Sequence, residues 1–419
     1  MLALDCGQPF GPARDEEFFR ALPARPAVFL IEAKQHGGQP YLVRTADLRR
    51  RVERLLRAPA EPTKRLNLRE FAAGVRYRLT GSTFEQALVF YQHAREKFPQ
   101  RYRDLARLRP PVLLKVNLRN EYPRCYITRR VVGSGGFYFG PFPARKAAES
   151  FANEFLNLFK IRRCQIKIRR DPSFPGCIYS EMRMCLAPCF AGCSKQEYDV
   201  EVGRVTAFLA SAGASLTGEL EQEREATSAA LDFERAATIH RKIEKIGGVL
   251  RGLPELARKV DELDAVIVQP AAEEESVAIF AVRAGHIADP LYLRFGELAS
   301  QPRSVEEMLR EFLEPRMHTD EHGNEEEGLP QGGAESTKKA AVDALSPSFE
   351  FRVSNAELSE HLSLLARWFY SKPRIGEIFF REKRWPYRRI LRACSRLLAP
   401  QPSLPLEKGK QDGAADERR

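Results

Sequence analysis

Five of the eight cysteines in this chain fall between Leu158 and Tyr198. Four of the five follow the spacing C-x12-C-x7-C-x3-C, and thiolates brought together in this way can hold an iron–sulfur cluster or a structural zinc ion. The spacing matches neither the common ferredoxin patterns nor paired C-x2-C zinc motifs, so it identifies no particular metal. The four candidate ligands are Cys164, Cys177, Cys185 and Cys189, and Cys193 remains unassigned.

Positive charge surrounds these thiols. Nearby cations favour the thiolate form, which is the form that binds metals, and they also suit a phosphate backbone. Free thiols packed in a small core, or thiols with a redox role, are the alternatives. The flanking cations are Arg162, Arg163, Lys167, Arg169, Arg170 and Arg183.

The basic excess of the chain is concentrated just before and within the cysteine stretch. The whole chain has a net charge of +11, and residues 101–170 hold 17 Lys and Arg against four acids. Aromatic residues are interleaved with these cations, a pattern typical of nucleic-acid binding, although a solvated basic face would look similar. The candidate DNA-contacting residues are Arg124, Arg129, Arg130, Tyr138, Arg162 and Arg163.

The N-terminal residues do not resemble a secretory signal, because acids appear early and no basic segment precedes the short apolar run. No apolar run approaches the roughly 20 residues that span a bilayer. We therefore expect a cytoplasmic protein with no membrane partner, in a reducing compartment where disulfides are not expected.

Hydrophobic periodicity predicts an α+β chain. Two short strands in 27–43 lead into an amphipathic helix within 44–58, and a strand near 75–79 precedes a helix capped at Ser82 or Thr83. Residues 215–250 predict an antiparallel helical hairpin in which Asp232 caps the second helix. Three strands are expected in 263–298, and the segment after 349 predicts a helix, a short strand at GEIFF and a basic helix.

Several strings resemble a known family. PAVFLI, YLVRTADLRRRV and FEQALVFYQHAREKFPQRY are similar to the GIY-YIG nuclease domain at the front of the UvrC family of excinucleases, whose motifs look like PGVYLM, YVGKAxNLRxRV and EALLLEANLIKxYxPRYN. YPRCYITRR and YFGPFP resemble the region that follows that domain in the family. The resemblance implies remnant catalytic roles for Tyr41, Arg44 and Arg51.

The nuclease resemblance departs from the family at residues needed for cutting. The first motif tyrosine falls on Phe29, and the metal-binding glutamate falls on Tyr91. Hydrolysis of this type needs a divalent ion held by carboxylate oxygen, so we expect the site to be inactive or nearly so. Mg²⁺ or Mn²⁺ bound through relocated ligands remains open, and with it the question of whether the protein is an enzyme.

The resemblance also covers the cysteines and the helical hairpin. RRC and PGCIYSEMRMCLAPCFAG are similar to the family cysteine patch, which implies a [4Fe-4S] cluster on Cys164, Cys177, Cys185 and Cys189, with zinc as the alternative. LDFERAA resembles the UVR motif, which implies that Phe233, Glu234 and Ala237 contact the UvrB helicase. A hairpin that buries Phe233 within this chain is the other interpretation.

We expect a multidomain chain without the RNase H-like second nuclease domain or tandem helix-hairpin-helix module of the family. The expected units are a degenerate GIY-YIG-like domain at 16–103, a basic cysteine-rich domain at 104–200, a UVR-like hairpin at 201–252, a truncated β-rich remnant at 260–315 and 349–398, a disordered linker at 316–348 and a disordered tail at 400–419.

The favoured function is that of a UvrC-like DNA-binding protein of nucleotide excision repair with impaired endonuclease chemistry. One alternative is an active GIY-YIG endonuclease that makes a single metal-dependent incision in damaged DNA. Another is a redox-responsive iron–sulfur module that binds nucleic acid.

Overall fold

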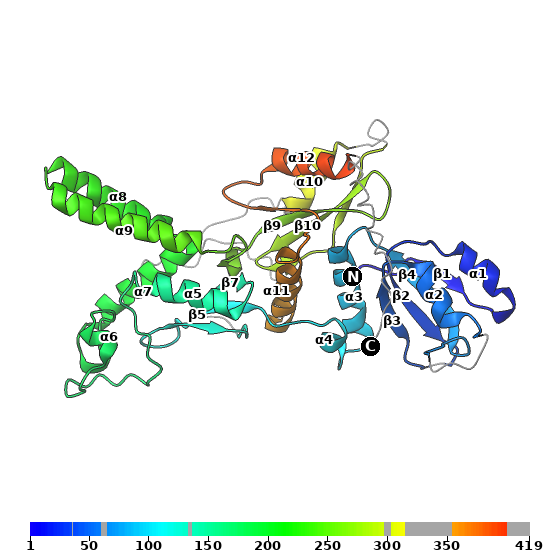
Figure 1. The fold of residues 1–419 in the computed structure, drawn as a ribbon, viewed down its shortest axis with the longest axis horizontal. Coiled ribbons are helices and arrows are strands. Elements are labelled where there is room, and N and C mark those ends of the chain that lie inside the picture. Colours follow the sequence, from blue (N-terminus) through cyan, green and yellow to red (C-terminus); the bar gives the residue numbers. More distant parts are fainter. Residues whose placement is uncertain (36, 60–64, 133–135, 297–302, 315–353, 400–419) are drawn as a thin grey trace, which may run out of the picture.

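The computed structural model describes residues 1–419 except 36, 60–64, 133–135, 297–302, 315–353 and 400–419. Three antiparallel sheets and the helices packed on them make up the described residues. The molecule is elongated, with the N-terminal sheet at one end and a pair of long helices projecting at the other (Figure 1). This mixture of helices and antiparallel sheets confirms the predicted α+β class.

The front unit is a four-stranded sheet in the order β1-β4-β2-β3. Its elements are β1 (Cys6–Pro9), α1 (Asp15–Ala21), β2 (Ala27–Ala33), β3 (Tyr41–Thr45), α2 (Leu48–Leu56), β4 (Ala72–Leu79), α3 (Thr83–Lys97) and α4 (Tyr102–Leu105).

The central strand β2 is apolar on both faces, because helices cover both sides of the sheet. Phe29 and Ile31 belong to the core that includes the buried residues of α2, whereas Val28 and Leu30 belong to the core that includes α3. This division follows from the period-2 alternation of side chains along a strand. Of the two predicted caps, Ser82 is the one that caps α3: its hydroxyl accepts a hydrogen bond from the Glu85 backbone N–H at 3.1 Å.

The middle unit is a sheet in the order β6-β5-β7-β8 with helices packed against it. A run of stacked phenylalanines joins the sheet to two helices: Phe139 to Phe151 at 6.2 Å, Phe151 to Phe155 at 5.6 Å and Phe155 to Phe208 at 5.9 Å between ring centroids. The elements are β5 (Val112–Val116), β6 (Cys125–Thr128), β7 (Phe137–Phe142), α5 (Arg145–Leu156), α6 (Ile178–Glu181), α7 (Lys195–Ala210), α8 (Ala214–Ala229), α9 (Phe233–Arg251) and β8 (Arg258–Lys259).

The C-terminal unit is a sheet in the order β11-β10-β9-β13, in which β12 also pairs with β10. The strands predicted in 263–298 and at GEIFF are present. The elements are β9 (Ala265–Pro270), β10 (Ser276–Arg283), β11 (His286–Ile287), β12 (Leu291–Arg294), α10 (Val305–Leu313), α11 (Asn355–Phe369), β13 (Glu377–Phe380) and α12 (Tyr387–Leu398).

The front and C-terminal units share one hydrophobic core. Phe84 of α3 meets Phe280 of β10 at 5.0 Å and Trp368 of α11 at 5.2 Å between ring centroids. Helices α3 and α11 lie near one another at the centre of the molecule (Figure 1). Trp368 is buried. Helix α11 therefore belongs structurally to the front unit as much as to the C-terminal one.

Strand β1 is absent from the sequence predictions, which began the front domain at residue 16, yet it pairs with β4 from Cys6 to Pro9. The predicted disordered segments 316–348 and 400–419 lie outside the described residues. Within the described residues, no helix combines the length and apolar character needed to cross a membrane.

Candidate nucleic-acid interface and cysteine cluster

The remnant catalytic residues are divided between the two faces of the front sheet. Tyr41 packs with the α2 side of the core, and Arg51 lies on α2 itself. Arg44 points to the opposite side, where its guanidinium lies 5.7 Å from the centre of the Phe90 ring. The Nε atom of Arg51 is buried and has no hydrogen-bond partner among the described residues. The structure thus keeps Arg51 on the Tyr41 side and directs Arg44 elsewhere.

Tyr91, at the position of the family glutamate, is buried and committed to a hydrogen-bond network. Its hydroxyl donates to Glu360 Oε2 at 2.7 Å and accepts from Arg95 Nη1 at 3.2 Å. Burial, followed by the hydrogen bond to Glu360, raises the pKa of Tyr91 well above its ordinary value. Tyr91 therefore stays neutral and supplies no anionic ligand for a divalent ion.

Glu360 brings a carboxylate next to Tyr91 from the far end of the chain, but its oxygens are already engaged. Besides Tyr91, Tyr102 donates its hydroxyl to Oε1 at 2.6 Å and Arg103 donates Nε to Oε1 at 2.9 Å. The Glu360 side chain is 6% exposed. A carboxylate that accepts three hydrogen bonds and pairs with a guanidinium is stabilised as a structural anion rather than left open as a cation ligand.

Glu85, the other acid near the start of α3, is also engaged. Its Oε1 accepts from the Tyr292 hydroxyl at 2.5 Å, and its Oε2 accepts from the Gly81 N–H at 2.8 Å. Burial raises the pKa of this carboxyl group. Both Glu85 and Glu360 thus have their carboxylate oxygens engaged in hydrogen bonds within the fold.

His361, next to Glu360, makes stability depend on pH. Its buried Nδ1 accepts a hydrogen bond from the Ile287 N–H at 3.0 Å. Burial lowers the pKa of His361 to about 4. The negative charges of Glu357 and Glu360 oppose this lowering, and the positive charges of His286 and Arg95 add to it. The unfolded chain takes up this proton near pH 6.5, whereas the folded chain resists it. We expect stability to fall between pH 6.5 and 4 by on the order of 3 kcal/mol from this group.

His361→Asn keeps an acceptor for the Ile287 N–H but does not titrate. Urea unfolding at pH 7 and pH 4.5 should therefore show a smaller loss of unfolding free energy on acidification in His361→Asn than in the parent protein. An equal loss in both proteins would assign the acid sensitivity to other groups.

The four candidate metal ligands lie on loops and short turns between α5 and α7. Cys177 is the N-terminal capping residue of α6, and Cys189 lies in a 3-10 turn over Pro188–Phe190. Three non-glycine residues near them have positive φ, an uncommon conformation that often marks functional loops: Arg183, Ala187 and Ala191. These turns could not be predicted from the sequence, because alanine has no intrinsic preference for a left-handed backbone conformation.

Electrostatics couples the four thiols. Burial raises the pKa of Cys185 to about 11, the Ala187 N–H opposes the rise, and charge on Cys164, Cys177 and Cys189 adds to it. The Ala187 N–H lies 3.3 Å from Cys185 Sγ, and Arg162 Nη1 lies 4.0 Å from Cys164 Sγ. Backbone N–H and cationic donors aimed at sulfur are partners that suit thiolate ligands.

The hydrogen-bond donors around the sulfurs therefore suit a thiolate-bound metal. The four sulfur atoms are, however, not arranged around a common centre in the described residues. In the part of the chain that the structure describes, no group of three or more His, Cys, Asp or Glu side chains is arranged closely enough to hold an ion. Cys193 is buried in the core of the middle unit with Tyr198 and Val202. Its surroundings are those of a packing residue.

The predicted DNA-contacting residues separate into exposed and internal sets. Arg129 and Arg130 are exposed at the end of β6, and Arg124 is half-buried, 4.6 Å from the centre of the Tyr126 ring. Tyr138 is buried, and its hydroxyl donates to the Val132 carbonyl at 3.0 Å.

Arg162 and Arg163 also make internal contacts. Arg162 is buried and donates to the carbonyls of Tyr122 and Ile166, both at 2.8 Å. Arg163 is half-buried and donates to Asn157 Oδ1 at 2.9 Å. Of the predicted DNA-contacting residues, those open to a polyanion are therefore Arg129 and Arg130, which follow β6, with half-buried Arg124 just before it.

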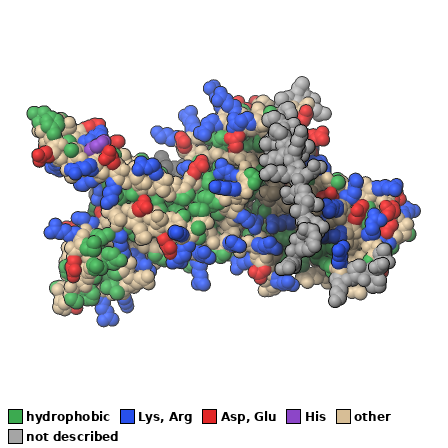
Figure 2. All heavy atoms as spheres, viewed as in Figure 1, with side chains coloured by type: hydrophobic (Ala, Val, Ile, Leu, Met, Phe, Trp, Pro, Cys, Tyr) green, Lys and Arg blue, Asp and Glu red, His purple; other side chains and the backbone are tan. Residues whose placement is uncertain are grey.

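The tip of the helical hairpin is apolar and exposed. Phe233 is 63% exposed and Leu231 73% exposed, and Glu234 and Ala237 are also exposed. Figure 2 shows hydrophobic side chains gathered at this tip. Asp232 caps α9 as predicted, accepting the Arg235 N–H at 3.1 Å. Phe233 is thus not buried within this chain.

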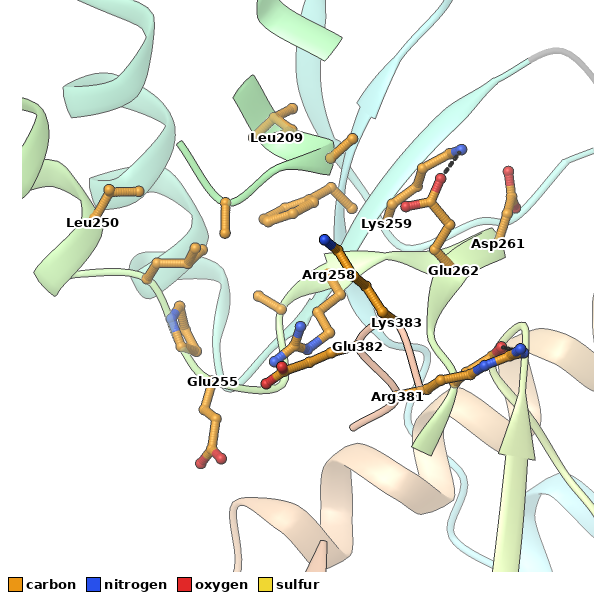
Figure 3. A pocket seen from close by; sticks show the side chains of 17 residues that line it. Leu209, Leu250, Glu255, Arg258, Lys259, Asp261, Glu262, Arg381, Glu382 and Lys383 are labelled. Atoms are coloured by element: carbon orange, nitrogen blue, oxygen red, sulfur yellow. Dashed lines mark hydrogen bonds and ion pairs between the residues drawn. The ribbon is translucent and has the colours of Figure 1, made fainter. Parts of the chain in front are cut away.

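A cavity of about 640 Å³ lies between the middle and C-terminal units (Figure 3). Its charged side chains are of both signs and partly paired: Lys259 bonds Glu262 at 2.7 Å, and Arg381 lies 3.5 Å from Asp264. A lining of balanced charge does not favour a polyanion.

Comparison with known proteins identifies the middle unit. Residues 112–208 match the family model "UvrC/Cho excinuclease, middle domain". The chain is 30% identical over 286 residues to UvrABC system protein C of Carboxydothermus hydrogenoformans, covering 67% of this chain and 46% of that protein. It is 26% identical over 299 residues to the protein of the same name from Moorella thermoacetica, covering 71% of this chain and 48% of that protein.

The chain spans about half the length of the curated relatives it matches. No solved structure matches it.

Proposed function

We propose, from the premise that this chain is a homologue of UvrABC system protein C, that it binds DNA and acts in nucleotide excision repair. The observation that carries the proposal is the basic edge of the matched middle domain, where half-buried Arg124 precedes the edge strand β6 and exposed Arg129 and Arg130 follow it. Guanidinium groups bind phosphates and release the counterions of the duplex, so this binding depends steeply on salt.

The GIY-YIG-like front unit is proposed to contribute binding rather than cutting. The position of the metal-binding carboxylate is occupied by Tyr91, and the carboxylate that contacts Tyr91 already accepts hydrogen bonds from Tyr102 and Arg103. Without a hard anionic ligand the charge that develops on a scissile phosphate has no divalent ion to stabilise it. We therefore propose that endonuclease chemistry at this site is impaired.

The cysteines are proposed to hold a [4Fe-4S] cluster, with zinc as the alternative. Cys164, Cys177, Cys185 and Cys189 would be the ligands, and the Ala187 N–H would hydrogen-bond the Cys185 sulfur. Such a group, when bound, would link the loops between α5 and α7 and offset the mutual repulsion of the thiolates.

The hairpin tip is proposed as the surface for a protein partner. Exposed Phe233 and Leu231, next to Glu234 and Ala237, offer an apolar anchor with a charged rim. The resemblance of LDFERAA to the UVR motif supports UvrB as that partner.

A salt series of DNA-binding measurements tests the central proposal. We expect the triple variant Arg124→Ala, Arg129→Ala, Arg130→Ala to bind a lesion-bearing duplex about tenfold or more weakly at 100 mM salt, and to lose up to about 3 units of the slope of log affinity against log salt. The triple variant Arg384→Ala, Arg388→Ala, Arg392→Ala removes the same charge from exposed positions beside and on α12 and should change binding much less.

The same preparations test the chemistry. With Mg²⁺ or Mn²⁺ present, the parent protein should leave the duplex intact. Incision by the parent protein that disappears in Tyr41→Phe would instead establish an active endonuclease. A DNA affinity that changes only when the cluster is oxidised would establish the redox-responsive module. Absence of salt-sensitive DNA binding would overturn the proposal.

A further inference from the structure

We infer that a second, arginine-lined cavity at the junction of the front unit, the middle unit and α11 binds backbone phosphates of DNA. The inference rests on the proposed function, and it assigns one phosphate-binding site within it. The cavity has a volume of about 920 Å³. Its basic lining residues are Arg44, Arg107, Arg109, Arg129, Arg145 and Arg367.

The lining of this cavity carries charge of one sign. Six arginines contribute to it and no aspartate or glutamate does, and the remaining lining residues are apolar or neutral, including Ser363 and Tyr370. The cavity in Figure 3, in contrast, mixes both signs. A concave surface lined by one sign of charge concentrates its field and attracts a counter-charged ligand.

Most of the guanidinium groups in this cavity lack anionic partners among the described residues. Within the described residues Arg145 pairs with Glu149 at 2.7 Å, and the other five arginines form no ion pair. Burial lowers the pKa of Arg44, and the positive charge of Arg107 lowers it further. Burial likewise lowers the pKa of Arg367, and the positive charge of Arg44 adds to that effect. Arg44 thus repels cations from two other segments, Arg107 and Arg367, and a bound anion would relieve that repulsion.

Hydrogen bonds hold the walls of the cavity in place. The Arg109 backbone N–H donates to Ser363 Oγ at 3.1 Å, and Arg367 Nη1 donates to the Ala106 carbonyl at 2.9 Å. The Tyr370 hydroxyl donates to the Pro141 carbonyl at 2.8 Å. Helix α11 is therefore fastened both to the segment after α4 and to the end of β7, so the arginines are brought together before any ligand arrives.

The arginine lining extends beyond this cavity. A neighbouring cavity of about 270 Å³ shares Arg109 and Arg129 with it and adds exposed Arg130; its lining also holds Arg103, which is paired with Glu360 at 2.9 Å. Six guanidinium groups in one cavity exceed the charge of a single phosphate, and the continuation to exposed Arg130 provides for successive phosphates. This extent favours a phosphodiester chain over a mononucleotide, and Arg129 joins the cavity to the DNA-binding edge proposed above.

The triple variant Arg44→Gln, Arg107→Gln, Arg109→Gln tests the site, with Arg384→Gln, Arg388→Gln, Arg392→Gln as the control of equal charge. Fluorescence anisotropy with a labelled duplex should show at least about tenfold weaker binding in the cavity variant than in the control at 100 mM salt, with a shallower salt dependence. Thermal unfolding without ligand should occur at the same or a higher temperature in the cavity variant, because repulsion is removed.

Sodium tripolyphosphate supplies a readout that does not depend on DNA. Because a ligand that binds only the folded chain raises the unfolding temperature, tripolyphosphate should stabilise the parent and the control by a few degrees, and the cavity variant by less. Equal stabilisation of all three proteins together with equal DNA affinity would overturn the inference. If the Arg124, Arg129, Arg130 variant still lost affinity in that case, the proposed function would stand without this site.

Discussion

Cys185→Ser is expected to abolish bound iron in protein purified without oxygen, together with its visible absorption. Burial raises the pKa of Cys185, and charge on each of the other three candidate ligands adds to that rise. Removal of one thiolate from a four-thiolate site leaves a coordination position open and exposes the cluster to loss. The parent should carry about four iron atoms per chain, as a [4Fe-4S] cluster requires.

Cys6→Ser is the matched control, because it also replaces a sulfur by an oxygen, but at an exposed position on β1 outside the cysteine cluster. It should retain the iron and colour of the parent. One zinc ion per chain with no colour would select the zinc alternative, and undiminished iron in Cys185→Ser would contradict the proposed ligand set.

Glu360→Ala is expected to lower the free energy of unfolding by about 3 kcal/mol, because it removes a buried acceptor and leaves donors unpaired. The buried Tyr91 hydroxyl loses its acceptor, and Tyr102 and Arg103 lose theirs. Urea unfolding followed by tryptophan fluorescence is a direct measurement, since Trp368 lies buried on the same helix.

Glu360→Gln keeps the shape and one carbonyl acceptor, so it should cost distinctly less than Glu360→Ala. A double-mutant cycle with Tyr91→Phe should give a coupling energy of about 1 kcal/mol or more between the two side chains. Additive effects of the two substitutions would show that the hydrogen bond between them does not stabilise the fold.

Local pattern was sufficient to predict much of the fold. The continuous apolar run Val28, Phe29, Leu30 and Ile31 predicted a strand, and this strand lies at the centre of a sheet covered on both faces. Ser82 and Asp232 were recognised as helix caps because capping is a contact between residues three apart. Strand β1 was missed because CGQP shows no hydrophobic alternation, and its pairing with β4 alone reveals it.

The candidate sites depended on contacts that sequence could not reveal. Tyr91 meets Glu360, which lies 269 residues away, and Arg44 shares a cavity with Arg367. The only local indication that Glu360 makes a buried contact was its position within the apolar face of the helix ELSEHLSLLARWF. Composition also grouped Tyr138 and Arg162 with exposed cations, although both are buried, because residue type does not determine which face of the fold it occupies.

The helical hairpin begins and ends at the same place on the molecule. Gly213, ahead of α8, lies so close to the side chain of Leu250 near the end of α9 that an added methyl group would stand 2.7 Å from it. Adjacent end points are the geometry at which segments can be exchanged between proteins without disturbing the host. The hairpin therefore has the geometry of a transplantable module, and exchanging its outer half, with Phe233 at its tip, would change the surface that we propose for a protein partner.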